Sequence, residues 1–392
     1  MNLNNLSDKI VFNILRNVRF GYLELVNHNG KIYKFGDPKN DLKANIKIKN
    51  PNFTFNLIKG GSVGFAESYM KNDFVTDDLS NLIEFTARNI NLIHRFSGIL
   101  DFPFINFVKN FFIKNTKRRS KQNISKHYDL GNDFFSLWLD KTLTYSSAIF
   151  DEKNRDLSDA QNNKYQKLID LIKPKTGDKV LEIGCGWGGF AEYLGKKYDV
   201  KLDCITISKK QFEFAKERIY KCGLNDKVNI HIKDYRDVKE KYNSIASIEM
   251  IEAVGKNYLE SYFKTIKKNL SNNGSAAIQA ITIDDNLFDR YKNKQDFIQK
   301  YIFPGGFLPN KASINKYVSK NGLTIKSYES YADHYSNTLA IWKKEFNKKW
   351  ETIKSQGFDL NFKRMWEFYL SYCEAGFRSK NIDLIQFSIQ NK

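Results

Sequence analysis

A glycine-rich turn that follows an apolar strand is the feature that most constrains this chain. Residues 180–190 read Val-Leu-Glu-Ile-Gly-Cys-Gly-Trp-Gly-Gly-Phe. Gly184, Gly186 and Gly188 let the backbone turn tightly and approach a ligand closely, because they carry no Cβ. The segment therefore predicts a buried strand, a tight turn and a helix, with a large ligand lying against the turn.

The glycines alone do not identify that ligand. Gly184, Gly186 and Gly189 also fit the dinucleotide pattern G-x-G-x-x-G, and a purely structural turn can have the same composition. Glu182 favours S-adenosylmethionine, because a carboxylate at this point can hold the amino group of its methionine part and would repel a pyrophosphate.

The residues that follow the next strand support the same choice. A nicotinamide enzyme would carry an acidic residue for the ribose about 20 positions after the turn. Asp203 is near that distance but lies in the middle of the expected strand, and Thr206 stands at its end. We therefore predict an S-adenosylmethionine site.

Helices and strands alternate from about residue 160 onward. This alternation predicts a doubly wound α/β sheet, with the ligand at the carboxyl ends of the strands. The expected helices are 160–172, 190–197 and 209–221, and the expected strands are 179–183, 201–207, 228–233, 244–250 and 276–283.

The preceding part of the chain reads as a smaller α+β domain. A hairpin is expected over 22–26 and 31–35, with Asn29 and Gly30 at its turn. Further strands are expected at 46–48 and 52–57, and helices at 8–19, 65–71 and 79–96. We place the domain boundary near residue 115, so that the smaller domain covers residues 1–115 and the α/β domain covers residues 116–392.

Charge and apolar pattern suggest a polyanionic partner. The formal net charge is +19, from 63 Lys and Arg against 44 Asp and Glu, so nucleic acid and an anionic membrane surface are both candidates. An apolar segment over 100–112 precedes a basic run over 114–121, which suits a membrane surface and equally suits a packed helix followed by a charged linker. No recognisable nucleic-acid motif accompanies the charge.

Other features bear on cellular location. The four cysteines lack the spacing of a disulfide framework or a zinc site, which favours a reducing cytosol. No stretch reaches the ~18 apolar residues that a membrane span needs. We expect a cytoplasmic protein whose contact with the inner membrane is peripheral.

Several segments besides the glycine turn resemble the cyclopropane-fatty-acyl-phospholipid synthase family and, more distantly, the mycolic acid cyclopropane synthases. They are residues 64–70, 125–135, 143–148, 301–309 and 372–378. The resemblance implies transfer of a methyl or methylene group from S-adenosylmethionine to the cis double bond of unsaturated phospholipid acyl chains, forming cyclopropane fatty acids. It also implies a seven-stranded, doubly wound, Rossmann-like α/β sheet of the class I methyltransferase type, with residues 1–115 as a lipid- or membrane-associating domain and residues 116–392 as the methyltransferase domain. The partners that it implies are an anionic phospholipid membrane surface and a second copy in a homodimer, and no nucleic acid.

The same resemblance implies a set of cofactor contacts. They are Tyr145, Ser146, Glu182, Gly184, Cys185, Gly186, Gly188, Thr206, Ile207, Gln211, Tyr235 and Arg236. A threonine at position 206 in place of a carboxylate also matches the family.

The reaction leaves a carbocation on the acyl chain, and ring closure needs a base that removes a proton from the transferred methyl group. The family is understood to hold a bicarbonate ion for this purpose. Glu252, Tyr335 and the backbone amide of Ile281 match its ligands, whereas Ser147 replaces a cysteine and Gln279 replaces a histidine. Serine and glutamine still offer hydrogen bonds but do not ionise in the same range.

Two further positions are candidates for the reaction. Tyr128, with Tyr145 and Tyr335, offers an aromatic face to the cation, although core packing explains these tyrosines equally well. Cys373 matches a cysteine that is sometimes assigned a catalytic part, and a position beside the acyl channel is the plainer interpretation.

Three other functions remain open at the level of sequence. The altered base site suits a related enzyme that makes methyl- or methylene-branched chains. A non-catalytic lipid-binding relative would keep the fold without the reaction. A nucleic-acid methyltransferase would carry a Pro-Pro-Tyr-type or catalytic-cysteine loop. Residues 249–252 read Glu-Met-Ile-Glu at the place where that loop would be.

Overall fold

The computed structural model describes residues 3–92, 130–153 and 156–392. The described chain forms two compact units. The first unit comprises residues 1–111, 294–300 and 350–381, and the second comprises 112–293, 301–349 and 382–392. The expected boundary at residue 115, the basic run 114–121 and Tyr128 all lie outside the described residues.

The first unit is built around a four-stranded sheet in the order β2-β1-β3-β4. Its strands are β1 (Tyr22–Val26), β2 (Ile32–Gly36), β3 (Lys43–Ile48) and β4 (Phe74–Val75). β1 is antiparallel to β2 and parallel to β3. The helices of this unit are α1 (Leu3–Leu15), α2 (Phe53–Met70), α3 (Leu79–Arg88), α15 (Trp350–Ser355) and α16 (Leu360–Arg378).

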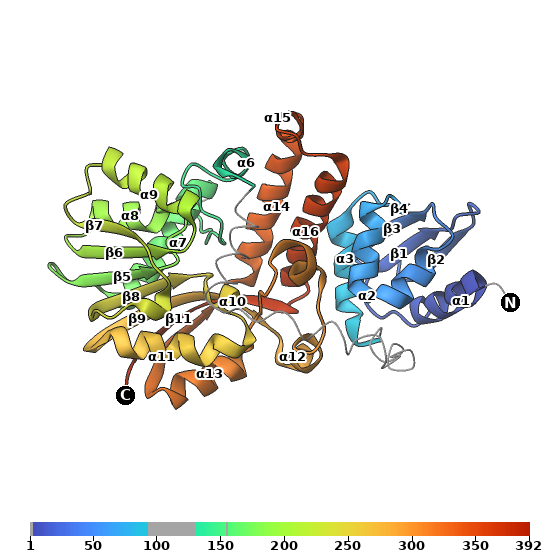
Figure 1. The fold of residues 1–392 in the computed structure, drawn as a ribbon. Coiled ribbons are helices and arrows are strands. Elements are labelled where there is room, and N and C mark those ends of the chain that lie inside the picture. The colour runs from blue at the N-terminus through green and yellow to red at the C-terminus, as the bar shows by residue number, and fades with distance from the viewer. Residues whose placement is uncertain (1–2, 93–129, 154–155) are drawn as a thin grey trace. The chain divides into compact units, whose positions relative to one another are not determined.

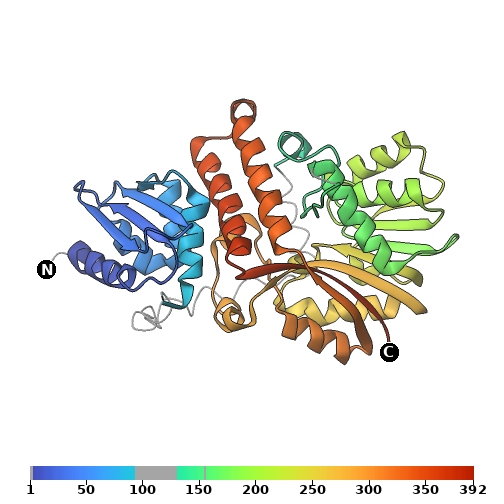
Figure 2. The same cartoon turned by 180° about the vertical axis from the view of Figure 1, so that it is seen from behind.

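Two features of this unit differ from the sequence-based expectation. Residues 53–57 begin α2 and are not a strand, because Phe53 turns inward to pack on Phe65 and Phe74 while Phe55 is left 37% exposed. Residues 350–381, including α16, group with the N-terminal segment (Figure 2). The two consecutive domains expected from the sequence placed residues 350–381 in the C-terminal domain instead.

α16 is held in the first unit by a partly buried ion-pair network. Its Glu374 accepts a hydrogen bond from Ser80 of α3 at 2.7 Å, and its Arg378 pairs with both Glu374 and Glu84. Phe368 packs against Phe65 with 5.9 Å between ring centroids. The helix therefore supplies both apolar and ionic contacts to this unit.

The second unit contains a seven-stranded sheet in the order β10-β11-β9-β8-β5-β6-β7 (Figure 1). Its strands are β5 (Lys179–Ile183), β6 (Lys201–Thr206), β7 (Val228–Ile232), β8 (Tyr242–Ile248), β9 (Leu270–Ile283), β10 (Leu323–Ser330) and β11 (Ile382–Asn391). β5 to β9 are mutually parallel, and β11 runs antiparallel to both of its neighbours, β9 and β10. The predicted seven-stranded α/β fold is confirmed.

Helices cover both faces of this sheet (Figure 1). The helices of the second unit are α6 (Asn132–Ser136), α7 (Leu157–Ile172), α8 (Gly189–Lys197), α9 (Lys209–Lys221), α10 (Ile251–Val254), α11 (Leu259–Asn269), α12 (Asp285–Tyr291), α13 (Lys311–Lys320) and α14 (Ala332–Lys348), with the short helical turns η1 (Tyr235–Asp237), η2 (Lys256–Tyr258) and η3 (Ile298–Ile302). η3 runs across the division between the units at residue 300.

The two faces of the sheet carry separate apolar cores. α7, α8 and α9 pack against one face, and α11 and α13 pack against the other. On β5, Val180 joins the first core whereas Leu181 and Ile183 join the second. Both faces of this strand are therefore apolar, as expected for a parallel strand covered by helices on both sides.

Candidate active site

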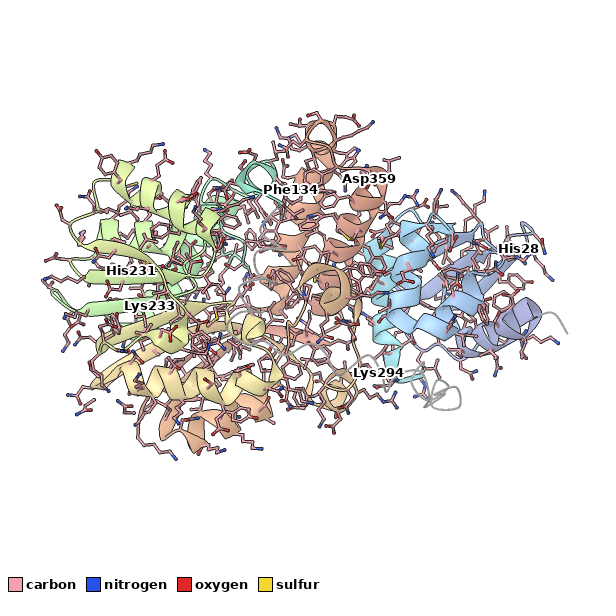
Figure 3. All side chains as sticks on the ribbon, viewed as in Figure 1. His28, Phe134, His231, Lys233, Lys294 and Asp359 are labelled. Carbon is pink, nitrogen blue, oxygen red and sulfur yellow. The ribbon has the colours of Figure 1, made fainter. Side chains whose placement is uncertain are left out.

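A cavity of about 170 Å³ opens at the carboxyl ends of β5, β6 and β8, in the second unit. The strand order reverses between β5 and β8, which is where open α/β sheets bind their ligands. The glycine turn that follows β5 forms one wall, and residues 143–146 form another. Lys233, which follows β7 and is labelled in Figure 3, lines the cavity on the β7 side.

Every cofactor residue implied by the resemblance lines this cavity except Gly188. Gly188 has a φ of +82° at the start of α8, and a Cβ built on it would lie 3.1 Å from the Cβ of Ala215 on α9. Its role is therefore to let α8 begin close to α9. Gly186 has a φ of +52°, and a Cβ there would meet nothing within 4 Å, because that side faces the cavity.

Glu182 is the acidic group of the cavity. Its side chain is 2% exposed, and its Oε2 has no hydrogen-bond partner among the described residues. Burial raises its pKa to about 7, against smaller opposite effects of Cys204 and Lys164. An orphaned buried carboxylate oxygen beside a cavity needs a donor, and a cationic amino group or a hydroxyl of a ligand would supply one.

The strand after the glycine turn contributes polar groups that are already ordered. Thr206 Oγ1 donates to Gln211 Oε1 at 3.0 Å and accepts from the amide of Ser208 at 3.2 Å. On the opposite side, Arg236 pairs with Asp234 at 2.6 Å, and its guanidinium lies 5.3 Å from the ring centroid of Tyr258. These side chains fit a nucleoside better than a pyrophosphate, because an acidic group stands at each end of the cavity.

A second carboxylate, Glu249, stands at the end of β8 and lines the same cavity. Its backbone has a φ of +48°, which is uncommon for a residue other than glycine and is found chiefly where function requires it. Its Oε1 accepts from the amide of Ser147 at 2.9 Å and from Gln279 Nε2 at 2.8 Å, and its Oε2 accepts from the Tyr335 hydroxyl at 2.6 Å.

These three donors are the groups that the resemblance assigned to a bound anion. Gln279 is itself fixed by Gln386 Nε2 at 2.9 Å, and both side chains are buried. Ser147 contributes its backbone amide, whereas its hydroxyl donates to the carbonyl of Ala148. The carboxylate of Glu249 therefore occupies the position at which the sequence predicted bicarbonate.

Glu252 lies three residues further along, on α10. Its Oε1 accepts from the amide of Ile281 at 2.5 Å, and its Oε2 is buried without a hydrogen-bond partner among the described residues. Burial, followed by the nearby Glu249, raises the pKa of Glu252 to about 8. Because Ile281 and the three donors on Glu249 are all engaged by carboxylates, the residues present do not fit a separate bicarbonate ion.

Tyr145 lines the cavity and packs within a cluster of aromatic rings. Tyr145 lies 5.4 Å from Trp342, 5.1 Å from Phe135 and 6.4 Å from Phe303, measured between ring centroids. Tyr335 meets Trp342 edge-on at 6.2 Å. Such faces stabilise a cation and exclude water. Cys373 lies on α16 in the other unit and is not among the residues that line the cavity.

Sequence reasoning did not identify Glu249 or Lys164 as parts of the site. Glu249 could have been found as a charged residue at the carboxyl end of an apolar strand, which is where such sheets place ligand groups. Lys164 carried no such signal, because a lysine in an amphipathic helix ordinarily faces solvent.

Comparison with known proteins agrees with the geometry. The family model for mycolic acid cyclopropane synthetase matches residues 115–387. The tuberculostearic acid methyltransferase UfaA1 of Mycobacterium tuberculosis is 34% identical over 377 residues, covering 94% of this chain and 87% of that protein. The cyclopropane-fatty-acyl-phospholipid synthase of Escherichia coli is 34% identical over 346 residues, covering 88% and 87%.

A solved structure gives the same result. Mycolic acid cyclopropane synthase CmaA1, complexed with SAH and CTAB, superposes with a TM-score of 0.65 at 28% identity, covering 69% of this chain and 98% of that one. The resemblance predicted from the sequence is confirmed. The chain belongs to the mycolic acid cyclopropane synthetase family and is an S-adenosylmethionine-dependent methyltransferase of the cyclopropane-fatty-acyl-phospholipid synthase type.

Proposed function

We propose that this enzyme transfers a methyl group from S-adenosylmethionine to the cis double bond of an unsaturated phospholipid acyl chain, and that Glu249 is the built-in base of the reaction. The observation that carries this proposal is the Glu249 carboxylate held by Ser147, Gln279 and Tyr335 beside the cofactor cavity. The names of the relatives support an acyl substrate, since they include a phospholipid synthase and a fatty acid methyltransferase.

Bound S-adenosylmethionine would supply an electrophilic methyl group to the alkene. Glu182 and the backbone of the glycine turn would hold the amino-acid part, and Tyr235 and Arg236 would enclose the nucleoside. Tyr145 and Trp342 would exclude water from the alkene and face the cation that forms on the chain. Glu249 would then accept one proton, which restores a neutral product.

The fate of the cation decides the product. Removal of a proton from the transferred methyl group with closure onto the cationic carbon gives a cyclopropane. A hydride shift from the methyl-bearing carbon to its neighbour, followed by loss of a methyl proton, gives a methylene branch. Both routes need one base and no reductant, whereas a saturated methyl branch would need a hydride donor as well.

The geometry of Glu249 favours the methylene branch. A carboxylate that is fixed by three donors and by its own backbone can take a proton only from an atom that comes to it. A small bound ion could move with the methyl group as the ring closes. The hydride shift moves the charge to the more substituted carbon, which carries the more stable cation, and loss of a methyl proton to Glu249 then gives the methylene group. The cyclopropane is the alternative outcome of the same reaction.

The test is expression in a bacterium that lacks its own cyclopropane synthase, followed by mass spectrometry and proton NMR of fatty acid methyl esters. We expect a gain of one CH₂ on unsaturated chains and the vinylidene protons of a methylene group. Upfield cyclopropane protons would establish the ring product instead. No gain of CH₂ would refute the proposal. Glu260→Gln, which removes a surface carboxylate paired with Lys320, is the matched control.

We propose further that the enzyme meets its substrate at an anionic membrane surface. The net charge of +19 supports this, and within the described residues no helix combines the length and apolar character that a membrane span requires. Pelleting with phosphatidylglycerol vesicles should decline steeply as salt rises, because screening weakens surface attraction. Equal pelleting with neutral vesicles would contradict it. The expected homodimer stays a prediction.

A further inference from the structure

Lys164 is a fully buried lysine that the proposed reaction leaves without a part. It lies on α7, and its side chain is 0% exposed. Among the described residues it forms no ion pair. Its ammonium donates to Ser146 Oγ at 2.7 Å and lies 4.6 Å from the ring centroid of Tyr165. An unpaired ammonium in an apolar interior is costly, so its presence calls for an explanation.

Two hydrogen-bonded routes connect Lys164 to Glu249. In the first, the ammonium holds Ser146, whose neighbour Ser147 donates its amide to Glu249. In the second, Gln386 Nε2 lies 3.5 Å from the carbonyl of Lys164 and 2.9 Å from Gln279 Oε1, and Gln279 donates to Glu249. The cation thus lies directly behind the loop and strand that hold the carboxylate.

We propose that Lys164 is a positioning residue that keeps Glu249 ionised and aimed into the cavity, by placing a buried positive charge behind Ser146 and Ser147. The inference rests on the proposed role of Glu249. A charge in the interior acts over a longer distance than one in water, because little solvent screens it. Lys164 therefore does not need to touch Glu249 in order to favour its charged form.

The groups around Glu249 and Lys164 favour the charged form of each side chain against the effect of burial. Burial raises the pKa of Glu249, and the hydroxyl of Tyr335 on α14, the amide of Ser147, Gln279 on β9 and Lys164 on α7 each lower it. Glu252 on α10 is the nearby acid, and its own pKa is raised by Glu249. Burial lowers the pKa of Lys164 to about 7, and Glu249, Asp140 and Glu182 oppose this.

Replacing Lys164 should therefore displace the acidic limb of the pH profile. Without the cation the pKa of Glu249 rises further, so the base becomes protonated at a higher pH and activity is lost from that pH downward. We expect the acidic limb of kcat for Lys164→Met to move upward by about one pH unit or more, the usual effect of a nearby opposite charge. Lys164→Arg should keep the wild-type limb.

The assay uses the full chain with vesicles of dioleoyl phosphatidylglycerol. Lys167→Met makes the same change on the same helix at a half-buried site over Tyr331, and should leave the limb in place. A folded Lys164→Met with a lower kcat at every pH and an unmoved limb would overturn the proposal. If Lys164→Met does not fold, Lys164→Gln, which removes the charge but keeps a hydrogen-bond donor for Ser146, should shift the limb in the same direction, and an unmoved limb would again overturn the proposal.

A titration that needs no turnover separates this inference from the proposed function. The carbonyl stretch of protonated Glu249 can be followed by difference infrared spectroscopy, as wild type minus Glu249→Gln, in the presence and absence of Lys164→Met. If the wild-type enzyme modifies no lipid, the proposed function is refuted, and this titration still tests whether Lys164 lowers the pKa of Glu249. A midpoint unchanged by Lys164→Met contradicts the inference even when the enzyme is active.

Discussion

At the scale of single residues, the most consequential side chain is Glu249, and its replacement gives the sharpest prediction. Glu249→Gln keeps the size and part of the hydrogen bonding but cannot accept a proton. We expect methylation of unsaturated lipid to fall by about 10²-fold or more, as for loss of a general base, while S-adenosylmethionine still binds by calorimetry. Retention of most activity would show that the proton leaves by another route.

Glu249→Gly offers a complementary experiment. Glycine accepts the positive φ without strain, and the change frees the donors on Ser147, Gln279 and Tyr335. We expect this variant to be nearly inactive in bicarbonate-free buffer and to recover when bicarbonate is added, with cyclopropane protons in the product. Glu260→Gly, treated in the same way, should not respond to bicarbonate. Absence of rescue would mean that the freed donors do not hold an anion productively.

Glu252 yields a prediction about stability and pH. Its pKa is about 8 in the folded enzyme, against 4.5 for an ordinary glutamate, so the folded state binds more protons between these pH values. Stability from this group is therefore lost as pH rises from about 4.5 to 8. Glu252→Gln should raise the free energy of unfolding at pH ~8 by ~3 kcal/mol and by little at pH ~5. Urea unfolding at both pH values measures this, and an equal gain at both would contradict it.

At the scale of elements, the turn after β5 separates two uses of glycine. Gly186→Ala would place a methyl group into the cavity, whereas Gly188→Ala would press one against Ala215 of α9. Both changes strain a positive φ, at a cost of about 1 kcal/mol each. We expect Gly186→Ala to weaken S-adenosylmethionine binding by more than tenfold, and Gly188→Ala to lower the melting temperature with a smaller effect on affinity. The reverse ranking would place the cofactor elsewhere.

Helix α9 holds this turn through one side chain. Arg218 donates to the carbonyls of Thr142 at 2.8 Å and Trp187 at 3.0 Å and pairs with Glu192 at 2.7 Å. It thereby links the two segments that face each other across the cavity. Arg218→Met should weaken S-adenosylmethionine binding by about tenfold, the equivalent of ~1.4 kcal/mol, in calorimetry. Lys216→Met on the same helix is the control, and equal affinities in the two variants would remove Arg218 from this role.

The elements differ in how far the sequence specifies them. Strand β5, its turn and the wound sheet follow from local signals, because apolar periodicity and glycine spacing act within a few residues. The start of α2 does not, because Phe53 and Phe55 alternate like a strand and only packing on Phe65 and Phe74 decides otherwise. The cofactor wall was predictable by resemblance. The partnership of Glu249 with Gln279, Ser147 and Tyr335 was not, since it joins residues that are far apart in the chain.

At the scale of the whole molecule, the first unit is built from segments that are far apart in the chain, which leads to a prediction about folding. The described residues 3–92 belong to one compact unit with α16, whose buried Glu374 and Phe368 contact α3 and α2. A fragment of residues 1–111 lacks these partners and leaves Ser80, Glu84 and Phe65 exposed. We expect it to show poorly dispersed NMR signals and rapid proteolysis compared with the same segment in the full chain. A well-dispersed spectrum would show that α16 is dispensable for this unit.

The position of β11 has a consequence for biosynthesis. This strand lies between β9 and β10, although it follows both in the chain, and it carries Gln386, which orients the partner of Glu249. While the ribosome is making residues 323–381, β10 has no neighbour in the sheet and Gln279 lacks its support. The reactive carboxylate is therefore secured only in the last stage of synthesis, after the cofactor turn has formed. We therefore expect a nascent chain to bind S-adenosylmethionine before it can complete the proposed reaction.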